Sequence, residues 1–444
     1  MAMKLSARQA LTGTAAVLLV TAAAACSSSG SSPSSAASAG SSTFGVNATG
    51  TVQFWARTVS KTLAQKLVSE FNATHKGLTV KLTLTSINDD VTSLATSIRA
   101  GDPPDVVGLN DIDMPTFTKN GSFTDLTAAI DKLPYKAALS PGHVGLATND
   151  SKIYGVPYWA DLSVLWYNKT LFKQAGLNPD DPPTTYAQIL SDAQAINKLG
   201  HGISGATFAG DCQGCLGFTV QPGIWADGTH LTNGDISNQT ANISGNTPLQ
   251  DALTLYRQLW SQHLVPDNDR TDNGTTWGQD FAAGKIGIMP GGYGQLVNLV
   301  KPSQLGTEFM DSPLPGSNGG YSTFDGGDDF AVPTAAKNAS GAWEFIQWVL
   351  QTQQQDQFPA LGATPVRTDV LTPAFSAKNP EDAVALKALA KGYAPVTLVY
   401  DQMFNQAGGP WFQMFSTAVY SGNLTLALQQ GQSGLARLLQ QAAP

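Results

Sequence analysis

The chain has 444 residues, more than one hydrophobic core usually serves, so we expect two lobes. Its 25 Lys and Arg against 33 Asp and Glu give a formal net charge of −8, which argues against nucleic acid or another polyanion as a partner. Only 13% of the residues are charged, while polar uncharged residues and nine tryptophans are plentiful, a surface chemistry that suits neutral, hydroxyl-rich ligands.

The first 25 residues have the pattern of a cleaved export signal. Lys4 and Arg8 form a positive start, and the apolar run 11–20 is too short to span about 30 Å of hydrocarbon. The string LLVTAAAAC resembles the lipobox of bacterial lipoproteins, although Ala23 stands where a leucine is more usual. We therefore expect 1–25 to be a lipoprotein signal peptide and Cys26 to carry a lipid anchor on the outer side of the cell membrane. The alternative is an ordinary secretory signal cleaved before Cys26, which keeps export without the anchor.

After a Ser, Ala and Gly stretch (26–48), typical of a flexible tether, strands and helices alternate along the chain. The alternation predicts an α/β fold with a parallel sheet, followed by mostly helical chain from residue 335. The predicted elements are strand 51–56, helix 61–72, strand 78–85, helix 89–99, strand 103–109, strand 164–167, helix 183–199 and strand 285–289.

Two cysteines, Cys212 and Cys215, form the CxxC string GDCQGC. This spacing fits a redox pair, half of a zinc site or a local disulfide. The histidines show no pairing that would complete a zinc site, and residues 210–217 look like a loop, which argues against a redox pair at a helix start. We expect a structural disulfide that holds a loop, no metal and no cofactor, and we regard the histidines as incidental.

Seven segments resemble segments of the extracellular sugar-binding proteins of bacterial ABC importers, the group that includes maltose-binding protein. They follow one another in the same order as in that family. The most similar segment is IYGVPYWADLSVLWYNKTLFKQAGL (153–177). The others are PDVVGLNDIDMPTFTKNGSFTDLT (104–127), PPTTYAQ (182–188), FAAGKIGIMPGGYGQL (281–296), PLPG (313–316), GGDDFAVPTAAKNASGAWEFIQWV (326–349) and GATPVR (362–367).

The resemblance implies the two-lobed, type II periplasmic-binding-protein fold, with a ligand cleft between the lobes and three crossings near 156–158, 289–291 and 328–330. It places the N-terminal lobe at 49–157 plus 291–328 and the C-terminal lobe at 158–290 plus 329–444. It further implies a monomer without enzyme activity, which captures a neutral sugar of one to several units and delivers it to the permease subunits of an importer.

Sugar recognition needs aromatic faces, which stack on the C–H patches of a sugar ring, and planar polar groups, which bind its hydroxyls. In open α/β sheets the loops after the strands face the crevice. Trp55 and Arg57 follow the first strand, although Trp55 could instead be core. Asn110 and Asp111 follow the strand 103–109, where Asp111 could alternatively cap the next helix.

Tyr158, Trp159 and Asp161 come directly after the first crossing and combine an aromatic platform with a carboxylate. The remaining candidates lie on loops or at the other crossings, and they are Trp225, Trp277, Gly292, Tyr293, Gly327, Asp328, Asp329 and Arg367. As alternatives, the two tryptophans pack as a lid on their lobe, the glycines are hinges that need a positive φ, and the arginine forms an ion pair between lobes.

Other functions stay open at this point. A glycosidase would need two carboxylates flanking one bond, but neighbouring residues of a strand, such as Asp328 and Asp329, point in opposite directions. The same fold could serve a sugar sensor or adhesin without transport. The ligand could also be a polyol, a glycerol phosphate, which would want more basic groups than Arg57 and Arg367, or a polyamine, which would want more carboxylates.

Overall fold

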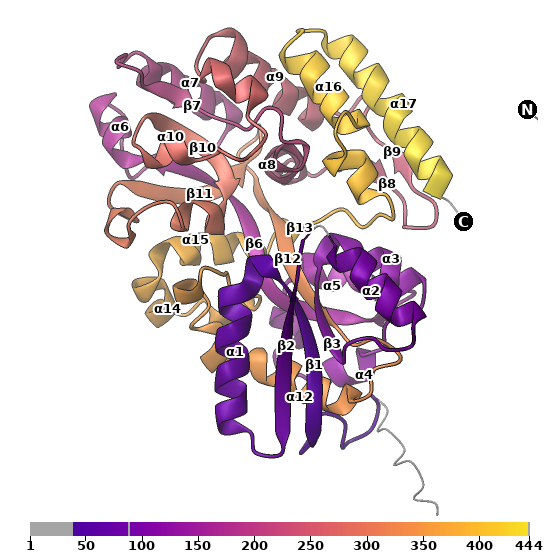
Figure 1. Cartoon of the computed structure of the whole chain (residues 1–444). Coiled ribbons are helices and arrows are strands. Elements are labelled where there is room, and N and C mark those ends of the chain that lie inside the picture. The colour runs from indigo at the N-terminus through magenta and orange to yellow at the C-terminus, as the bar shows by residue number, and fades with distance from the viewer. Residues whose placement is uncertain (1–38, 88, 443–444) are drawn as a thin grey trace, which may run out of the picture. The chain divides into compact units, whose positions relative to one another are not determined.

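The computed structural model describes residues 39–87 and 89–442, all of which belong to one compact unit of the chain. The predicted signal peptide and the predicted lipid anchor on Cys26 lie outside these residues. Figure 1 shows two lobes, with strands β6 (Gly155–Asn168) and β12 (Tyr321–Ala331) running from one into the other. The predicted two-lobed α/β fold is therefore confirmed. No helix of the described chain is long and apolar enough to cross a membrane.

The sheet of the first lobe has three parallel strands, in the order β2, β1, β3. Strand β12 pairs antiparallel with β3, and β6 pairs antiparallel with β12. The parallel strands end at one edge, so the residues that follow them lie together there. Helices α1 and α12 pack beside β1 and β2. The bounds are β1 (Gly50–Arg57), α1 (Lys61–Thr74), β2 (Leu78–Thr85), β3 (Val106–Asn110) and α12 (Ala339–Val349).

The sheet of the second lobe is formed around the second half of β6, which pairs antiparallel with both β10 and β11, while β7 runs parallel to β10. Helices α7, α8, α9, α16 and α17 cover this lobe (Figure 1). The bounds are α7 (Tyr186–Asn197), β7 (Ser204–Ala206), α8 (Gln213–Ala226), α9 (Thr247–Ser261), β10 (Ile286–Gly292), β11 (Phe309–Pro315), α16 (Pro410–Val419) and α17 (Leu424–Ala442).

Shorter elements lie between the strands of both sheets, and side-chain caps fix where several of the helices start. The Thr185 hydroxyl accepts a hydrogen bond from the Gln188 amide at the start of α7, as the sequence predicts. The short helices are η1 (Thr58–Ser60), α2 (Asp90–Arg99), η2 (Asp111–Asp113), α3 (Met114–Lys119), α4 (Thr127–Ile130), η3 (Lys136–Ala138), α5 (Pro141–Leu146), α6 (Lys169–Gln174), η4 (Asp267–Thr271), α10 (Gln279–Ala282), α11 (Tyr293–Val297), η5 (Pro302–Gln304), α13 (Thr352–Gln355), η6 (Pro359–Leu361), η7 (Thr368–Val370), α14 (Pro373–Lys378), α15 (Pro380–Leu389) and η8 (Asp401–Asn405). The short strands are β4 (Thr148–Asn149), β5 (Lys152–Ile153), β8 (Thr232–Asn233), β9 (Thr240–Ala241) and β13 (Gly392–Tyr393).

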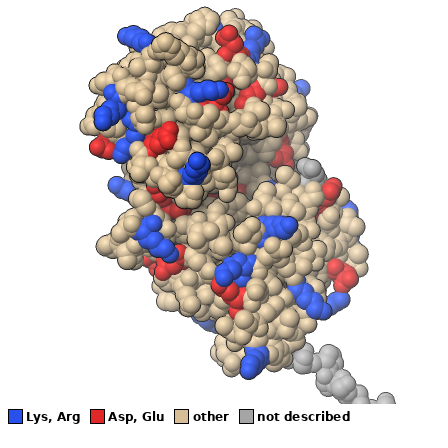
Figure 2. All heavy atoms as spheres, turned by 60° about the vertical axis from the view of Figure 1, so that its left-hand side comes forward, with Lys and Arg blue, Asp and Glu red and all other residues tan. Residues whose placement is uncertain are grey.

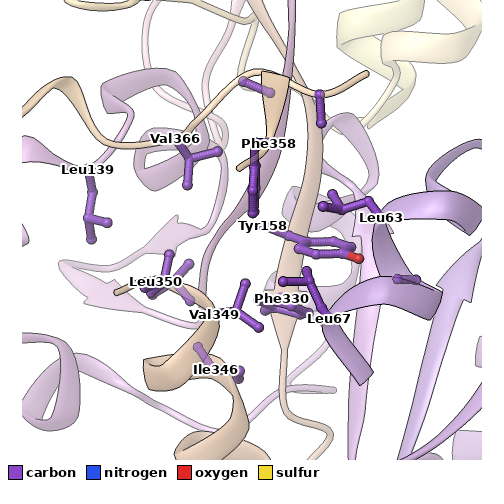
Figure 3. Close-up of a cluster of buried hydrophobic side chains, with 14 of the residues drawn as sticks. Leu63, Leu67, Leu139, Tyr158, Phe330, Ile346, Val349, Leu350, Phe358 and Val366 are labelled. Carbon is purple, nitrogen blue, oxygen red and sulfur yellow. The ribbon is translucent and has the colours of Figure 1, made fainter. Parts of the chain in front are cut away.

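Figure 3 shows part of the first lobe's core, where apolar side chains from β6, β12, α1 and α12 meet. Tyr158 stacks on Phe330 with ring centroids 4.1 Å apart, and Phe54 meets the Phe330 ring edge-on at 5.6 Å. Burying a side chain of this kind stabilises the fold by about 1.5–3 kcal/mol. Tyr158, predicted to contact ligand, is thus a core residue with no exposed surface.

The predicted lobe boundaries place two segments in the wrong lobe. The predicted boundaries place residues 291–328 in the N-terminal lobe, yet β11 pairs with the second half of β6, on the edge opposite to β10. Residues 329–444 were assigned to the C-terminal lobe, yet α12 packs on the first-lobe strand β1, with Phe345 against Phe54. The sequence shows that a strand or helix forms, but not which neighbour it pairs with.

The end of the predicted flexible tether is docked rather than free. Within 39–48, Phe44 is only 6% exposed and stacks on Trp343 of α12, with ring centroids 6.3 Å apart. The Gly45 amide donates to Ser340 Oγ at 2.9 Å, and the Ala48 amide donates to the Glu344 carboxylate at 2.7 Å. The single aromatic residue in a small-residue stretch is what allows this docking.

Candidate ligand-binding cleft

A cavity of about 320 Å³ opens where the two lobes meet at the crossing strands. Its wall comes from the ends of β1 and β3, from β6 and β12, and from α8 and η8 of the second lobe. The lining residues are Arg57, Val59, Asn110, Asp111, Ile112, Trp159, Asp161, Gly214, Phe218, Phe324, Gly326, Gly327, Tyr400 and Asn405. Polar and aromatic groups therefore converge on one concave site, the arrangement typical of a small-molecule pocket.

Arg57 forms the first of two buried charge clusters beside the cavity. It ends β1, and its guanidinium lies between Asp90 (Nε to Oδ2, 2.9 Å) and Asp328 (Nη1 to Oδ1, 2.6 Å). Asp90 starts α2, and Asp328 is a fully buried residue of β12. Burial raises the pKa of Asp90, although Arg57 opposes the shift. The guanidinium is thus already paired, through Nε and Nη1, with two carboxylates of the protein.

His143 of α5 forms the second cluster, with no exposed surface. Its Nδ1 lies 3.0 Å from Asp329 Oδ1, and its Nε2 lies 3.5 Å from Asp325 Oδ1 and 3.0 Å from the Gly326 carbonyl oxygen. Ser140 Oγ and the Gly142 amide donate to the other Asp325 oxygen. Burial lowers the pKa of His143, but the carboxylates outweigh it and raise this pKa to about 10. The sequence-based view that the histidines are incidental is wrong for His143.

Asp111 and Asp161 line the cavity and lack a cation of their own. Asp111 is 1% exposed, its Oδ1 accepts from the Ile112 amide at 2.8 Å, and its Oδ2 has no hydrogen-bond partner among the described residues. It does not cap α3, so that alternative is wrong. The Asp161 carboxylate forms no hydrogen bond or ion pair within the described chain, and burial together with Asp328 raises its pKa to about 6.

Four aromatic side chains form the rest of the wall. Trp159 comes from β6, and its indole Nε1 has no partner within the described residues. Phe218 of α8 and Phe324 of β12 lie with ring centroids 5.2 Å apart, and Tyr400 lies 6.1 Å from Phe324. Only Trp159 is predicted from the sequence, because the start of α8 (residues 210–217) has the pattern of a loop and Tyr400 carries no local signal.

Six predicted residues line the cavity together, namely Arg57, Asn110, Asp111, Trp159, Asp161 and Gly327. Gly292 lies beside Asp161, and Asp328 and Asp329 are buried directly behind the wall. Gly327 has φ +134°, and a Cβ atom there would lie 2.1 Å from the Trp159 carbonyl oxygen, so this position requires glycine. Gly292 has φ −69° and needs no such freedom.

The other predicted residues lie away from the cavity. Trp55 is partly buried against core side chains, which agrees with the alternative that it is a core residue. Trp225 packs on Phe324, and Trp277 lies beside Gly291. Both tryptophans are therefore buried on their lobe. Tyr293 donates to Asp382 Oδ2 at 2.6 Å inside the protein.

Arg367, a further candidate, binds a near neighbour instead of the opposite lobe. Its guanidinium pairs with Asp369 at 2.6 Å, donates to the Leu350 carbonyl oxygen at 2.6 Å and covers the Tyr135 ring at 3.8 Å. The alternative of an ion pair between lobes is therefore wrong, because the partner carboxylate is two residues away in sequence.

Cys212 and Cys215 are joined in a disulfide, as predicted, but at the start of a helix and not in a loop. Cys212 caps α8, and its sulfur accepts from the Cys215 amide at 3.2 Å. The glycines around the motif favour a loop when read locally, and packing of α8 against β12 overrides that preference. Gly214, between the two cysteines, lines the cavity.

A chain with two α/β lobes joined by continuous strands, and with a polar and aromatic cavity at the junction, belongs to the class of cleft-type ligand-binding proteins. No group of three or more His, Cys, Asp or Glu within residues 39–87 and 89–442 is placed to hold a metal ion. The model of the family "Bacterial extracellular solute-binding protein" matches residues 66–385, so the chain belongs to this family.

Known proteins agree with this assignment. The solved structure of the sugar-binding protein MalE from Xanthomonas citri superposes with a TM-score of 0.78 at 21% identity, over 88% of this chain and 98% of that one. Diacetylchitobiose binding protein DasA of Streptomyces coelicolor is 22% identical over 65% of this chain and 66% of its own. The sn-glycerol-3-phosphate-binding periplasmic protein UgpB of Agrobacterium fabrum is 26% identical over 47% of each chain.

Proposed function

We propose that the protein is the sugar-binding component of an ABC importer, which captures a mono- to oligosaccharide outside the membrane and delivers it to permease subunits. The observation that carries this proposal is the cavity, in which aromatic faces and hydrogen-bonding groups from both lobes converge. Family membership and the sugar-binding relatives support it.

We further propose a monomer tethered to the cell membrane through a lipid on Cys26. We propose as ligand contacts the six predicted residues of the cavity wall, together with Phe218, Phe324 and Tyr400. Figure 2 argues against a polyanion as partner, because Lys and Arg are scattered among Asp, Glu and uncharged residues on this face and are not gathered into one basic patch.

We propose no catalytic role for the acidic residues. Asp328 and Asp329 are neighbours in β12, but Asp328 pairs with Arg57 and Asp329 with His143. Neither carboxylate has an exposed surface, so neither is placed to flank a glycosidic bond. This argues against the glycosidase alternative.

The test is a thermal-shift screen of the purified protein against mono-, di- and trisaccharides, polyols, glycerol phosphates and polyamines. A ligand at 100 times its dissociation constant stabilises the folded state by about 2.7 kcal/mol, which raises the unfolding temperature measurably. We expect a sugar to do so, and Trp159→Ala to abolish the shift. The matched control is Trp260→Ala, a half-buried tryptophan of α9 that does not line the cavity. Stabilisation by glycerol phosphate with none by any sugar would overturn the proposal.

A further inference from the structure

The cleft holds more carboxylates than its cations can balance. The two buried cations, Arg57 and His143, each lie between two carboxylates of the protein. These carboxylates are Asp90 and Asp328 for Arg57, and Asp325 and Asp329 for His143. Each cluster of one cation and two carboxylates has a surplus negative charge when its carboxylates are ionised.

Further carboxylates join these clusters without bringing a cation. Asp111 Oδ2 lies 3.9 Å from His143 Nε2, a nitrogen that already faces Asp325 and the Gly326 carbonyl oxygen. Asp161 has no hydrogen-bond or ion-pair partner in the described chain. Apart from Arg57, no lysine or arginine is among the lining residues. The negative charge of the wall is therefore not compensated by the residues described.

Buried carboxylates without a partner are unfavourable, and they respond either by holding a proton or by binding a cation. Burial and the Asp328 carboxylate raise the pKa of Asp161 to about 6, although the Arg57 guanidinium opposes the shift. The pKa of Asp113, which follows Asp111 in η2, is raised to about 7 by burial and Asp401. A positively charged group in the cavity would relieve the same surplus.

We propose that the sugar taken by this cleft carries a protonated amino group, which pairs with the Asp161 carboxylate. The proposal rests on the sugar-binding function proposed above and names the class of sugar. Asp161 faces the cavity beside Trp159 and Phe218, whose ring faces attract a cation as well as the C–H surface of a sugar. A sugar phosphate is disfavoured, because Arg57 is held by two carboxylates and Asp111 and Asp161 would repel the phosphate.

The experiment compares sugars that differ only in the group at C2 of each ring. Calorimetric titrations use glucosamine and glucose, and galactosamine and galactose. They also use three β-1,4 disaccharides: the disaccharide of two glucosamine units, its N-acetylated form diacetylchitobiose, and cellobiose. On whichever skeleton binds, we expect the amino sugar to bind at least about tenfold more tightly than the hydroxyl sugar, which corresponds to about 1.4 kcal/mol. At pH 6 Asp161 is about half protonated, so binding should also release about half a proton per ligand, detected as a difference in heat between two buffers.

Asp161→Asn removes the charge and keeps the shape. We expect this variant to lose the preference for the amino sugar over its hydroxyl partner and to lose the proton release, whatever its affinity for the hydroxyl sugar. The control, Asp280→Asn, removes a surface carboxylate that pairs with Lys285, and it should behave as wild type. Circular dichroism and the unfolding temperature confirm that both variants fold.

The outcomes separate this inference from the proposed function. Hydroxyl sugars that bind as tightly as their amino partners, or a preference that survives in Asp161→Asn, would overturn the inference and leave the sugar-binding function intact. Binding of spermidine with no binding of any sugar would overturn both.

Discussion

At the scale of single residues, His143 compensates the charge at the floor of the cleft. The positive His143 imidazolium lies between the Asp325 and Asp329 carboxylates. Removing His143 would leave the negative charge of these buried carboxylates uncompensated. We expect His143→Gln to lower the free energy of unfolding by about 3–5 kcal/mol, measured by urea denaturation at pH 7. His263→Gln, a substitution at an exposed histidine, should change it little.

The pH dependence of stability gives a second check on His143. Its folded pKa of about 10 lies above the ordinary value of 6.5, so its contribution to stability is complete below pH 6.5 and is lost as the pH rises through about 10. Wild type should therefore lose stability between pH 8 and 10, and His143→Gln should lose much less. Equal slopes for the two proteins would contradict a charged His143.

Asp161 makes binding itself dependent on pH. Its pKa of about 6 means that the carboxylate is mostly protonated at pH 5 and mostly charged at pH 7. If only the charged form binds ligand well, the apparent affinity for the sugar found in the screen rises by about tenfold over this range. Titrations at several pH values test this, with Asp161→Asn as the variant whose affinity stays flat.

Residues of the cavity could be predicted where a local rule applied. Arg57, Asp111 and Asp161 follow strands or crossings, and the carboxyl ends of parallel strands meet at one edge of a sheet. His143 could not be predicted, because its partners Asp325 and Asp329 lie more than 180 residues further along the chain. Position after a strand indicates where a side chain lies, but not whether another part of the protein has already bound it.

At the scale of elements, the close pairing of β12 with β6 depends on one glycine. Gly327 has φ +134°, and a Cβ atom at this position would lie 2.1 Å from the Trp159 carbonyl oxygen in β6. We expect Gly327→Ala to cost clearly more than the roughly 1 kcal/mol of an unfavourable φ alone, because β6 and β12 must separate. Gly101→Ala is the control, since its φ is +72° and nothing lies within 4 Å. Thermal unfolding of both variants checks this, and equal losses would contradict it.

The first turn of α8 is held by the disulfide, and this turn also lines the cavity. The loop between Cys212 and Cys215 is short, so reduction should cost less than about 3 kcal/mol of global stability. We expect reduction to act locally, with faster amide hydrogen exchange in 212–218. A Cys212→Ser, Cys215→Ser variant retains a good helix cap, and its exchange should not respond to reductant. Unchanged exchange in reduced wild type would contradict a local role.

Helix and strand periodicity were sufficient to predict most elements near the cleft, but α8 was missed. Gly214 and Gly217 weaken helix propensity, and Pro222 lies inside the helix. Its burial against β12 stabilises a segment that local propensity alone would leave irregular. The missed helix carries Phe218, so the error in secondary structure became an error in the site.

At the scale of the whole molecule, residues 39–48 fix where the chain leaves the first lobe. We expect Phe44→Ala to release this segment, so that limited proteolysis cuts within 39–48 much faster, while the sugar affinity is unchanged because the cavity is lined by other residues. Val46→Ala is the control, because Val46 is 54% exposed and packs little. Equal cleavage rates for the two variants would contradict the docking.

This docking also sets how far the binding site can stand from a membrane. If Cys26 carries the anchor, only residues 27–38 connect it to the folded unit, and an extended chain of this length reaches at most roughly 40 Å. A free tether up to residue 48 would have reached almost twice as far. The protein would therefore search for its permease within a thin layer above the lipid, where its effective concentration is high.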